Sequence, residues 1–294
     1  MNSNIAKDAR ANLVGSLWMT AAMALFAIED SLLKAAAQSL PVSQVLMLFG
    51  AGGALIFAAL ARRAGQPLAP KEVTSPAMVI RAGFEIFGRL FFTLAFVLTP
   101  LSSTTVILQA TPLVVVGAAA ILFGEQVGWR RWAAIFLGLA GVVVIIQPGG
   151  DSFTPLSILA VLGMIGFAGR DLASRVAPAS LSTSILGLYG FFALIAAGAL
   201  YAIFEDAPFV PVNYESGGII AMACAVGVIA YTSLMKAMRT GEVAAVTPFR
   251  YSRLLFGLAL GVLVFGEALT PPMIVGSVLI VLSGLFILWR GQRS

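Results

Sequence analysis

Charged residues stand inside two of the most hydrophobic stretches of this chain, and their order repeats. Residues 26–34 read FAIEDSLLK and residues 167–175 read FAGRDLASR. Each stretch begins with Phe-Ala, holds an acid at the fifth position and ends on a base at the ninth. An ionised side chain at the centre of a membrane helix costs about 2.5–3.5 kcal/mol on insertion scales. Such residues therefore face a charged partner or a water-filled cavity, and not lipid.

The candidate substrate-binding or cavity residues combine acids, bases and aromatic rings. They are the acids Glu29, Asp30, Glu85 and Asp171, the bases Lys34, Arg89, Arg170, Arg250 and Arg253, and the residues Gln109, Tyr251, Phe26 and Phe167. A cavity with both signs of charge suits a zwitterion, because its carboxylate binds Arg while its ammonium binds Asp or Glu. Aromatic rings nearby can pack an apolar side chain or a cation.

Spacing also offers a purely structural explanation of the same charges. Three sets lie four residues apart, namely Asp30 with Lys34, Asp171 with Arg175, and Arg81 with Glu85 and Arg89. Residues four apart share one helix face and can neutralise each other. Internal ion pairs that lower the insertion cost and charges that line a cavity are both open for these sets.

Two further features indicate a cavity near the apolar stretches at residues 243–265 and 102–123. Arg250 and Arg253 are three apart and have no acid on their own helix, so we expect them to face Glu85, Asp171 or a substrate carboxylate. Gln109 lies just before Pro112 in the middle of a helix, where a proline frees a carbonyl and often marks a kink. Packing flexibility alone is an equal explanation of the proline.

The elements that must position these residues are membrane-spanning helices. The chain of 294 residues is 60% hydrophobic and only 11% charged, with a mean hydropathy of +0.99, whereas soluble domains carry about 25% charged residues. Apolar runs of about 20 residues match the bilayer core. We predict an all-α polytopic membrane protein with ten helices at 12–37, 42–62, 76–98, 102–123, 129–147, 154–176, 180–204, 215–238, 243–265 and 271–289.

Composition excludes several other classes of protein. The chain has no histidine and a single cysteine, Cys224, which excludes internal disulfides, His- or Cys-based zinc sites and Ser-His or Cys-His catalysis. No G-x-S-x-G, H-E-x-x-H or P-loop pattern is present. The pI near 9.7 arises from bases in short loops, which is a membrane-orientation pattern and not a nucleic-acid surface. We expect no enzyme activity, cofactor, metal or nucleic-acid partner.

The loop charges predict the orientation of the helices. Of the 18 Lys and Arg residues, 12 fall on the side of the N-terminus. The charged residues of the opposite loops are all acids, namely Asp151, Glu205, Asp206, Glu215 and Glu267. Positive charge stays in the cytoplasm. Both termini are therefore expected on the cytoplasmic side of the inner membrane.

The two charged motifs belong to a longer repeat. LFGEQVGWRR at 122–131 aligns with VFGEALTPPM at 264–273, which divides the chain into five-helix units at 12–147 and 154–289. Because five is odd, the second unit must enter the membrane from the opposite side. Such inverted repeats, with a site near the midplane, are the usual architecture of secondary transporters.

The paired FGE at 123–125 and 265–267, the ten helices and the acid in the first helix of each unit resemble the drug/metabolite transporter superfamily, EamA-type permeases in particular. The resemblance covers essentially the whole chain and implies a transporter of small organic solutes, often an exporter of amino acids and other metabolites. The FGE glycine suits a helix C-terminus, and its Glu suits the membrane interface.

We therefore expect a secondary transporter that works by alternating access and exports amino acids or related zwitterions. Uptake of a vitamin, a nucleotide-like metabolite or an organic cation is the alternative. The expected partners are a small-molecule substrate and the lipid bilayer, with proton coupling through Asp30, Glu85 or Asp171, or exchange without protons. An intramembrane enzyme and a helper subunit of a larger assembly are the competing classes.

Overall fold

The computed structural model describes residues 2–124, 128–147, 154–176, 178, 180–240 and 246–291, and every regular element in these ranges is a helix. In chain order these are α1 (Asn2–Ala36), α2 (Val42–Arg63), η1 (Lys71–Thr74), α3 (Pro76–Leu98), α4 (Leu101–Leu108), α5 (Thr111–Phe123), α6 (Trp129–Ile146), α7 (Ser157–Arg175), α8 (Thr183–Ala202), α9 (Tyr214–Thr240), η2 (Thr247–Tyr251), α11 (Ser252–Phe265) and α12 (Pro271–Gly291). The all-α prediction is confirmed.

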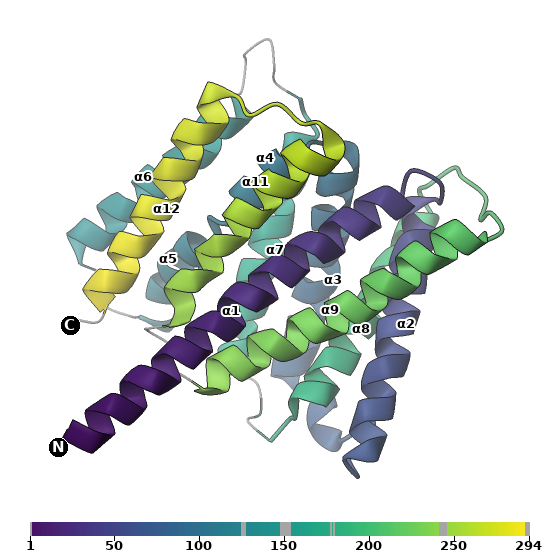
Figure 1. The fold of residues 1–294 in the computed structure, drawn as a ribbon, viewed down its shortest axis with the longest axis horizontal. Helices are drawn as coiled ribbons and strands as arrows, with labels where there is room; N and C mark the ends of the chain where they lie inside the picture. Colours follow the sequence, from purple (N-terminus) through teal and green to yellow (C-terminus); the bar gives the residue numbers. More distant parts are fainter. Residues whose placement is uncertain are drawn as a thin grey trace.

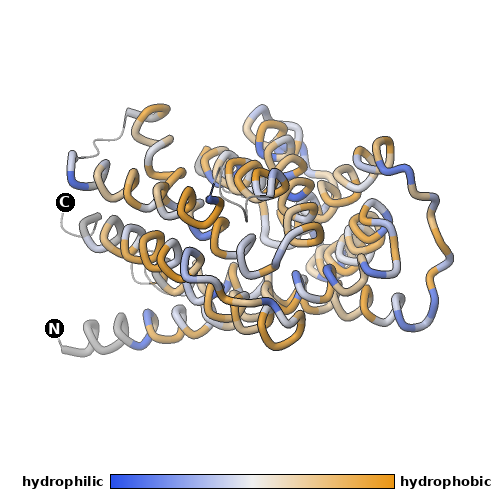
Figure 2. Tube along the Cα trace, turned by 90° about the horizontal axis from the view of Figure 1, so that it is seen from above, coloured by the Kyte–Doolittle hydropathy of each residue, from blue (hydrophilic) through white to orange (hydrophobic). Residues whose placement is uncertain are grey.

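Six helical segments of the described chain are long and apolar enough to cross a bilayer, and α6 and α12 contain shorter apolar helices. Two of the ten predicted spans fall outside both groups. Helix α3 is long enough but carries Arg81, Glu85 and Arg89 along its length, and α11, at 14 residues, is too short to cross a bilayer. Figure 2 shows how hydropathy is distributed along the chain, with hydrophobic residues along most of the helices and hydrophilic residues mainly at their ends and in the loops.

The fourth and ninth predicted helices are not continuous, which corrects their predicted form. The fourth divides into α4 and α5 at a turn over Gln109 and Ala110. Pro112 has no N–H for the Leu108 carbonyl, and that carbonyl instead accepts a bond of 2.5 Å from the Thr111 hydroxyl. In the ninth, the 3₁₀ helix η2 precedes the α-helix that begins at Ser252, and 241–245 lie outside the described residues.

Helices from the two halves of the sequence pack side by side. The most extensive contacts join α1 with α9, α3 with α7, α2 with α8, and α6 with α12, as Figure 1 shows. Glycines allow two of these approaches to be close. A Cβ at Gly88 of α3 would lie 3.1 Å from the Gly166 carbonyl carbon of α7, and one at Gly141 of α6 would lie 2.9 Å from the Gly276 oxygen of α12. Such small-residue contacts bind membrane helices together.

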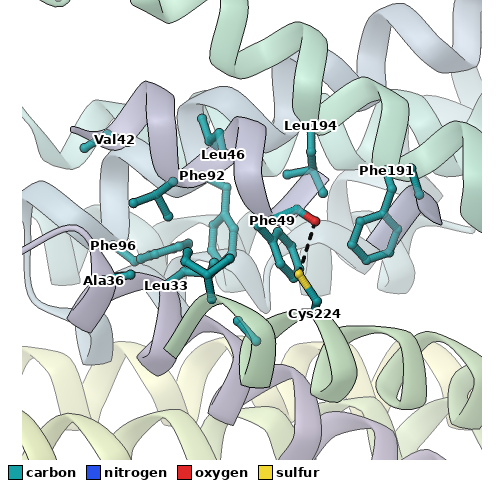
Figure 3. Close-up of a cluster of buried hydrophobic side chains, with 14 of the residues drawn as sticks. Leu33, Ala36, Val42, Leu46, Phe49, Phe92, Phe96, Phe191, Leu194 and Cys224 are labelled. Carbon is teal, nitrogen blue, oxygen red and sulfur yellow. Dashed lines mark hydrogen bonds between the residues drawn. The ribbon is translucent and has the colours of Figure 1, made fainter. Parts of the chain in front are cut away.

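The largest buried cluster lies where α1, α2, α3, α8 and α9 meet (Figure 3). Phe49 of α2 is fully buried, and its ring centroid lies 5.1 Å from the ring centroid of Phe191 in α8. The Cys224 thiol of α9 donates to the Phe49 carbonyl at 3.6 Å. This cluster packs α1 and α3, two of the helices that carry the charged residues, against α2, α8 and α9.

Both FG pairs end a helix in the same way. Gly124 after α5 has φ of +66° and Gly266 after α11 has φ of +65°, a left-handed conformation that favours glycine. The prediction that this glycine terminates a helix is confirmed in both copies. Of the two FGE acids, Glu267 is described, and Glu125 lies outside the described residues.

Candidate functional site

Four apolar helices bring their charged residues together in the interior of the molecule. Helix α1 contributes Glu29 and Asp30, α3 contributes Arg81, Glu85 and Arg89, α7 contributes Arg170 and Asp171, and α11 contributes Arg253. The side chains of Glu29, Asp30 and Glu85 are at most 4% exposed. We call these eight residues the charged network.

Asp30 and Arg253 form the first part of the charged network. An Arg253 Nη2 donates to Asp30 Oδ2 at 2.5 Å, a charge-assisted bond between α1 and α11. The guanidinium carbon lies 5.3 Å from the centroid of the Phe26 ring and 5.6 Å from that of Phe92. Its Nε is buried and has no hydrogen-bond partner among the described residues. One donor of the guanidinium fork is therefore free.

Glu85 is the centre of the second part. Its carboxylate lies 3.4 Å from Arg81 Nη2, 3.3 Å from Arg89 Nε and 3.3 Å from Arg170 Nη1. The predicted ladder of Arg81, Glu85 and Arg89 on α3 is confirmed. Arg81 also donates to the Ser174 hydroxyl at 3.0 Å, which joins α3 to α7.

Arg89 connects the two parts. Its Nη1 lies 3.6 Å from Glu29 Oε1, and Glu29 directly precedes Asp30 in the chain. Phe167 of α7 lies beneath this junction, with its ring centroid 5.7 Å from the Arg89 guanidinium carbon and 4.8 Å from that of Arg170. Acids, arginines and aromatic rings from both halves of the chain thus form one contiguous site.

Two pairings favoured by spacing have other partners in the structure. The pair of Asp30 with Lys34 is wrong, because Asp30 binds Arg253 and Lys34 Nζ lies 3.3 Å from Glu267 Oε1. Asp171 binds the adjacent Arg170 at 2.8 Å. The predicted partner Arg175 has a side chain outside the described residues. In the first case tertiary packing provides a closer partner than the helix turn does.

Of the partners expected for the two arginines near the ninth helix, neither Glu85 nor Asp171 contacts Arg253, and a substrate carboxylate stays a prediction. Arg253 contacts Asp30 and not Glu85 or Asp171, and Arg250 forms no ion pair with a described acid. The 3₁₀ helix η2 ends between them at Tyr251, and α11 begins at Ser252. The Arg250 carbonyl accepts a bond of 3.2 Å from Gln109 Nε2, which places Gln109 at the junction of α4 and η2.

Tyr251 lies away from the charged network. It is buried in a second cluster with residues of α4, α6 and α12, and a Cβ at Gly284 of α12 would meet its hydroxyl. The structure therefore brings Glu29, Asp30, Glu85, Arg89, Arg170, Asp171, Arg253, Phe26 and Phe167 together, and it places Lys34, Gln109, Arg250 and Tyr251 outside that group.

Glu267 has a larger role in the structure than its sequence position indicated. Its carboxylate accepts bonds from the Leu101 N–H at 2.7 Å, the Ser102 N–H at 2.9 Å and the Ser102 hydroxyl at 2.7 Å, at the start of α4. Burial opposes its ionisation, but these donors and Lys34 hold the pKa of Glu267 below its ordinary value. The FGE repeat was the available signal, although it did not reveal the partners.

An apolar groove of about 400 Å³ lies between α2 and α9, lined by Leu48, Gly52, Ile56, Val212, Gly217, Ile220, Ala221 and Cys224. None of these residues belongs to the charged network. No group of three potential metal ligands of the types His, Cys, Asp and Glu occurs in the part of the chain that the structure describes.

Comparison with known proteins connects this arrangement to a family. The model of the EamA-like transporter family matches residues 13–147 and again residues 155–289. One solved crystal structure superposes with a TM-score of 0.61 at 23% identity and covers 94% of this chain and 96% of that chain, a likeness of fold.

Three kinds of transporter are among the similar proteins. An S-adenosylmethionine uptake transporter of Rickettsia prowazekii is 24% identical over 216 residues, 74% of this chain and 72% of its own. The pseudopaline exporter CntI of Pseudomonas aeruginosa is 24% identical over 272 residues, 92% and 94% of the two chains. A riboflavin transporter of Vibrio cholerae is 24% identical over 286 residues, 96% and 95%.

Proposed function

Because the chain belongs to the EamA-like transporter family, we propose that it moves a small zwitterionic metabolite across the cytoplasmic membrane by alternating access. The similar proteins are transporters of small molecules and not enzymes. Membership of the family implies transport of small molecules through the membrane. We propose in addition the class of cargo, the residues that bind it and the direction of transport.

The ion pair of Asp30 with Arg253 is the observation that carries the proposal. The Arg253 guanidinium carbon lies 5.3 Å and 5.6 Å from the ring centroids of Phe26 and Phe92, and the pair joins α1 of the first half to α11 of the second. A cargo carboxylate binds Arg253 through two parallel N–H bonds, for which the free Nε is one donor. The cargo ammonium binds Asp30 or Glu29, and the rings hold the adjoining carbon chain.

The remaining charged network supports this binding mode. Glu85 binds Arg89 on its own helix α3 and Arg170 on α7. A movement of α3 relative to α7 therefore changes the distance between these two arginines. In alternating access the halves rock about a site near the membrane midplane. Ion pairs that exchange partners with the cargo allow both the empty and the loaded site to keep their charges neutralised.

We place ten spans in the membrane, arranged as two inverted five-helix units at 12–147 and 154–289 with both termini in the cytoplasm. The two matches to the family model support this division, as does the pairing of α1 with α9 and α3 with α7, which are the corresponding contacts in an inverted pair. Single cysteines at Lys71 and Glu215 test the topology. We expect them to react with an impermeant maleimide from opposite sides, and reaction from one side would exclude the inverted arrangement.

Export of amino acids or related zwitterions is the proposed direction, and uptake is the second candidate. The pseudopaline exporter favours the first, while the S-adenosylmethionine uptake transporters, whose cargo contains an amino acid, favour the second. Transport into proteoliposomes, with and without an imposed pH gradient or an internal amino acid, separates proton-driven transport from exchange.

A thermal-shift screen of purified protein tests the cargo class. The compounds are amino acids, organic cations, nucleosides and vitamins, and binding at 100 times Kd stabilises the folded state by about 2.7 kcal/mol. We expect zwitterionic amino acids to raise the melting temperature of the wild type, while Arg253→Ala and Asp30→Asn insert normally but lose this shift and transport. A shift from cations or nucleosides alone would refute the zwitterion. Normal transport by both variants would refute the site.

A further inference from the structure

Two charged residues of α1 bind the same neighbouring segment one helical turn apart. Asp30 pairs with Arg253 near the start of α11, and Lys34 pairs with Glu267 just after its end. These partners are 223 and 233 residues away in the sequence. The contact between α1 and α11 is thus held by two ion pairs, of which one belongs to the proposed binding site and the other does not.

Lys34 lies near the C-terminal end of α1 and contacts two other segments of the chain. Its ammonium donates to the Thr99 carbonyl at 2.8 Å and to Glu267 Oε1 at 3.3 Å, and it lies 5.1 Å from the centroid of the Phe265 ring. The same Glu267 carboxylate accepts the bonds from the start of α4. We call Lys34, Thr99 and Glu267 the latch, because Lys34 connects α1 to both the α3–α4 corner and the α11–α12 loop.

Asp30 and Lys34 remain potential partners of each other. They lie on one face of the continuous helix α1, about 6 Å apart along its axis. The other base near Asp30, Arg89, already contacts Glu29 at 3.6 Å and Glu85 at 3.3 Å. If Asp30 loses Arg253, Lys34 is the base that its own helix presents to it.

We propose that cargo binding opens the latch by an exchange of ion-pair partners. The cargo carboxylate takes Arg253 while the cargo ammonium binds Glu29, so Asp30 is released and attracts Lys34, and Lys34 leaves Glu267 and Thr99. The end of the molecule closed by the latch then opens. Lys34 and Glu267 are positioning residues in this scheme, which rests on the proposed function for the identity of the carboxylate but makes a prediction that needs no cargo.

The test replaces the cargo by a mutation. Arg253→Ala removes the partner of Asp30, as the cargo would, and Asp30→Asn in addition removes the charge that attracts Lys34. The reporter is Thr105→Cys in a Cys224→Ser background, since Thr105 is 1% exposed and lies against Gly257 of α11 beneath the latch. An impermeant maleimide is applied from the side at which α1 ends.

We expect Arg253→Ala to increase the labelling rate about fivefold, the population change from the loss of one ion pair of ordinary strength. The double variant Asp30→Asn/Arg253→Ala should return the rate to that of the reporter protein. Lys34→Met should label rapidly whether or not Arg253 is present. No increase with Arg253→Ala, or equal rates for the single and double variants, would overturn the partner exchange.

Glu205→Gln is the matched control. The Glu205 carboxylate accepts bonds of 2.9 Å from the Val42 and Ser43 N–H groups at the start of α2, the same geometry as Glu267 without the contact to α1. Its loss should leave reporter labelling unchanged, and an increase equal to that of Lys34→Met would show general loosening and overturn the latch. Size-exclusion profiles identify misfolded variants. The thermal-shift screen on the wild type tests the proposed function separately, because labelling requires no ligand.

Discussion

Replacing Gly88 by alanine tests the contact that holds α3 against α7. A Cβ at this position would lie 2.9 Å from Phe167 Cδ1, 3.0 Å from the Phe167 nitrogen and 3.1 Å from the Gly166 carbonyl carbon. The ring can rotate away, but the two backbone atoms cannot. The helices must therefore separate by a few tenths of an ångström, at a point between Glu85 and Arg89 of the charged network.

The size of the effect follows from two opposing contributions. Overpacking of a tight interior costs about 1–3 kcal/mol, and contacts with backbone belong at the upper end of that range. Replacing glycine by alanine inside a helix raises the free energy of unfolding by about 0.5–1 kcal/mol. We expect Gly88→Ala to lower the free energy of unfolding by about 1–2 kcal/mol. Gly83, on the same helix, has open space where a Cβ would be added, with no neighbouring atom within 4 Å, so Gly83→Ala should raise it by about 0.5–1 kcal/mol.

The assay is reversible unfolding of the two variants and the wild type in one detergent, followed by helical circular dichroism, together with transport in proteoliposomes. Gly88→Ala should melt below the wild type and transport more slowly, because Arg89 and Arg170 move apart with their helices. Gly83→Ala should melt at or above the wild type and transport normally. Equal shifts for the two variants, or a Gly88→Ala protein as stable as the wild type, would refute the close approach of α3 and α7.

Three further outcomes are expected. Since hydrogen bonds and Lys34 hold the pKa of Glu267 below 4.5, its ionised form stabilises the fold above that pH, and this stabilisation is lost as the pH falls through the lowered pKa. Melting temperatures of the wild type and Glu267→Gln should therefore differ at pH 6 and converge as the solution is acidified below about pH 4.5. Glu85→Gln should lower the free energy of unfolding by about 3–5 kcal/mol because it removes a buried carboxylate shared by three arginines. Asp171→Asn, at a side chain that is 26% exposed, should cost less than about 1 kcal/mol in the same melts. Arg253→Lys keeps the charge but loses the two-donor fork, and should raise the KM for a zwitterionic substrate about tenfold with normal insertion; an unchanged KM would show that the fork does not bind the cargo.

The sequence by itself determined the features that depend on near neighbours in the chain. Helix α3 has the predicted bounds, 76–98, because prolines at 76 and 100 limit it on both sides. The Arg81, Glu85 and Arg89 ladder formed because residues four apart share a helix face. Both FG pairs end their helices, since glycine adopts the left-handed conformation without steric cost. The all-helical class followed from composition.

Only the tertiary structure decided which charges from distant segments meet. The spacing predicted an ion pair between Asp30 and Lys34. In the packed structure α1 lies against α11, so Asp30 pairs with Arg253 and Lys34 with Glu267. Arg253 meets Asp30 of α1, whereas the Arg250 carbonyl accepts a bond from Gln109 and Tyr251 lies against Gly284 of α12. Spacing along a helix fixes which face a side chain occupies, and nothing in it specifies which helix will lie against that face. A buried charge takes the partner with the best geometry and least exposure to water, and that partner exists only once the helices have packed.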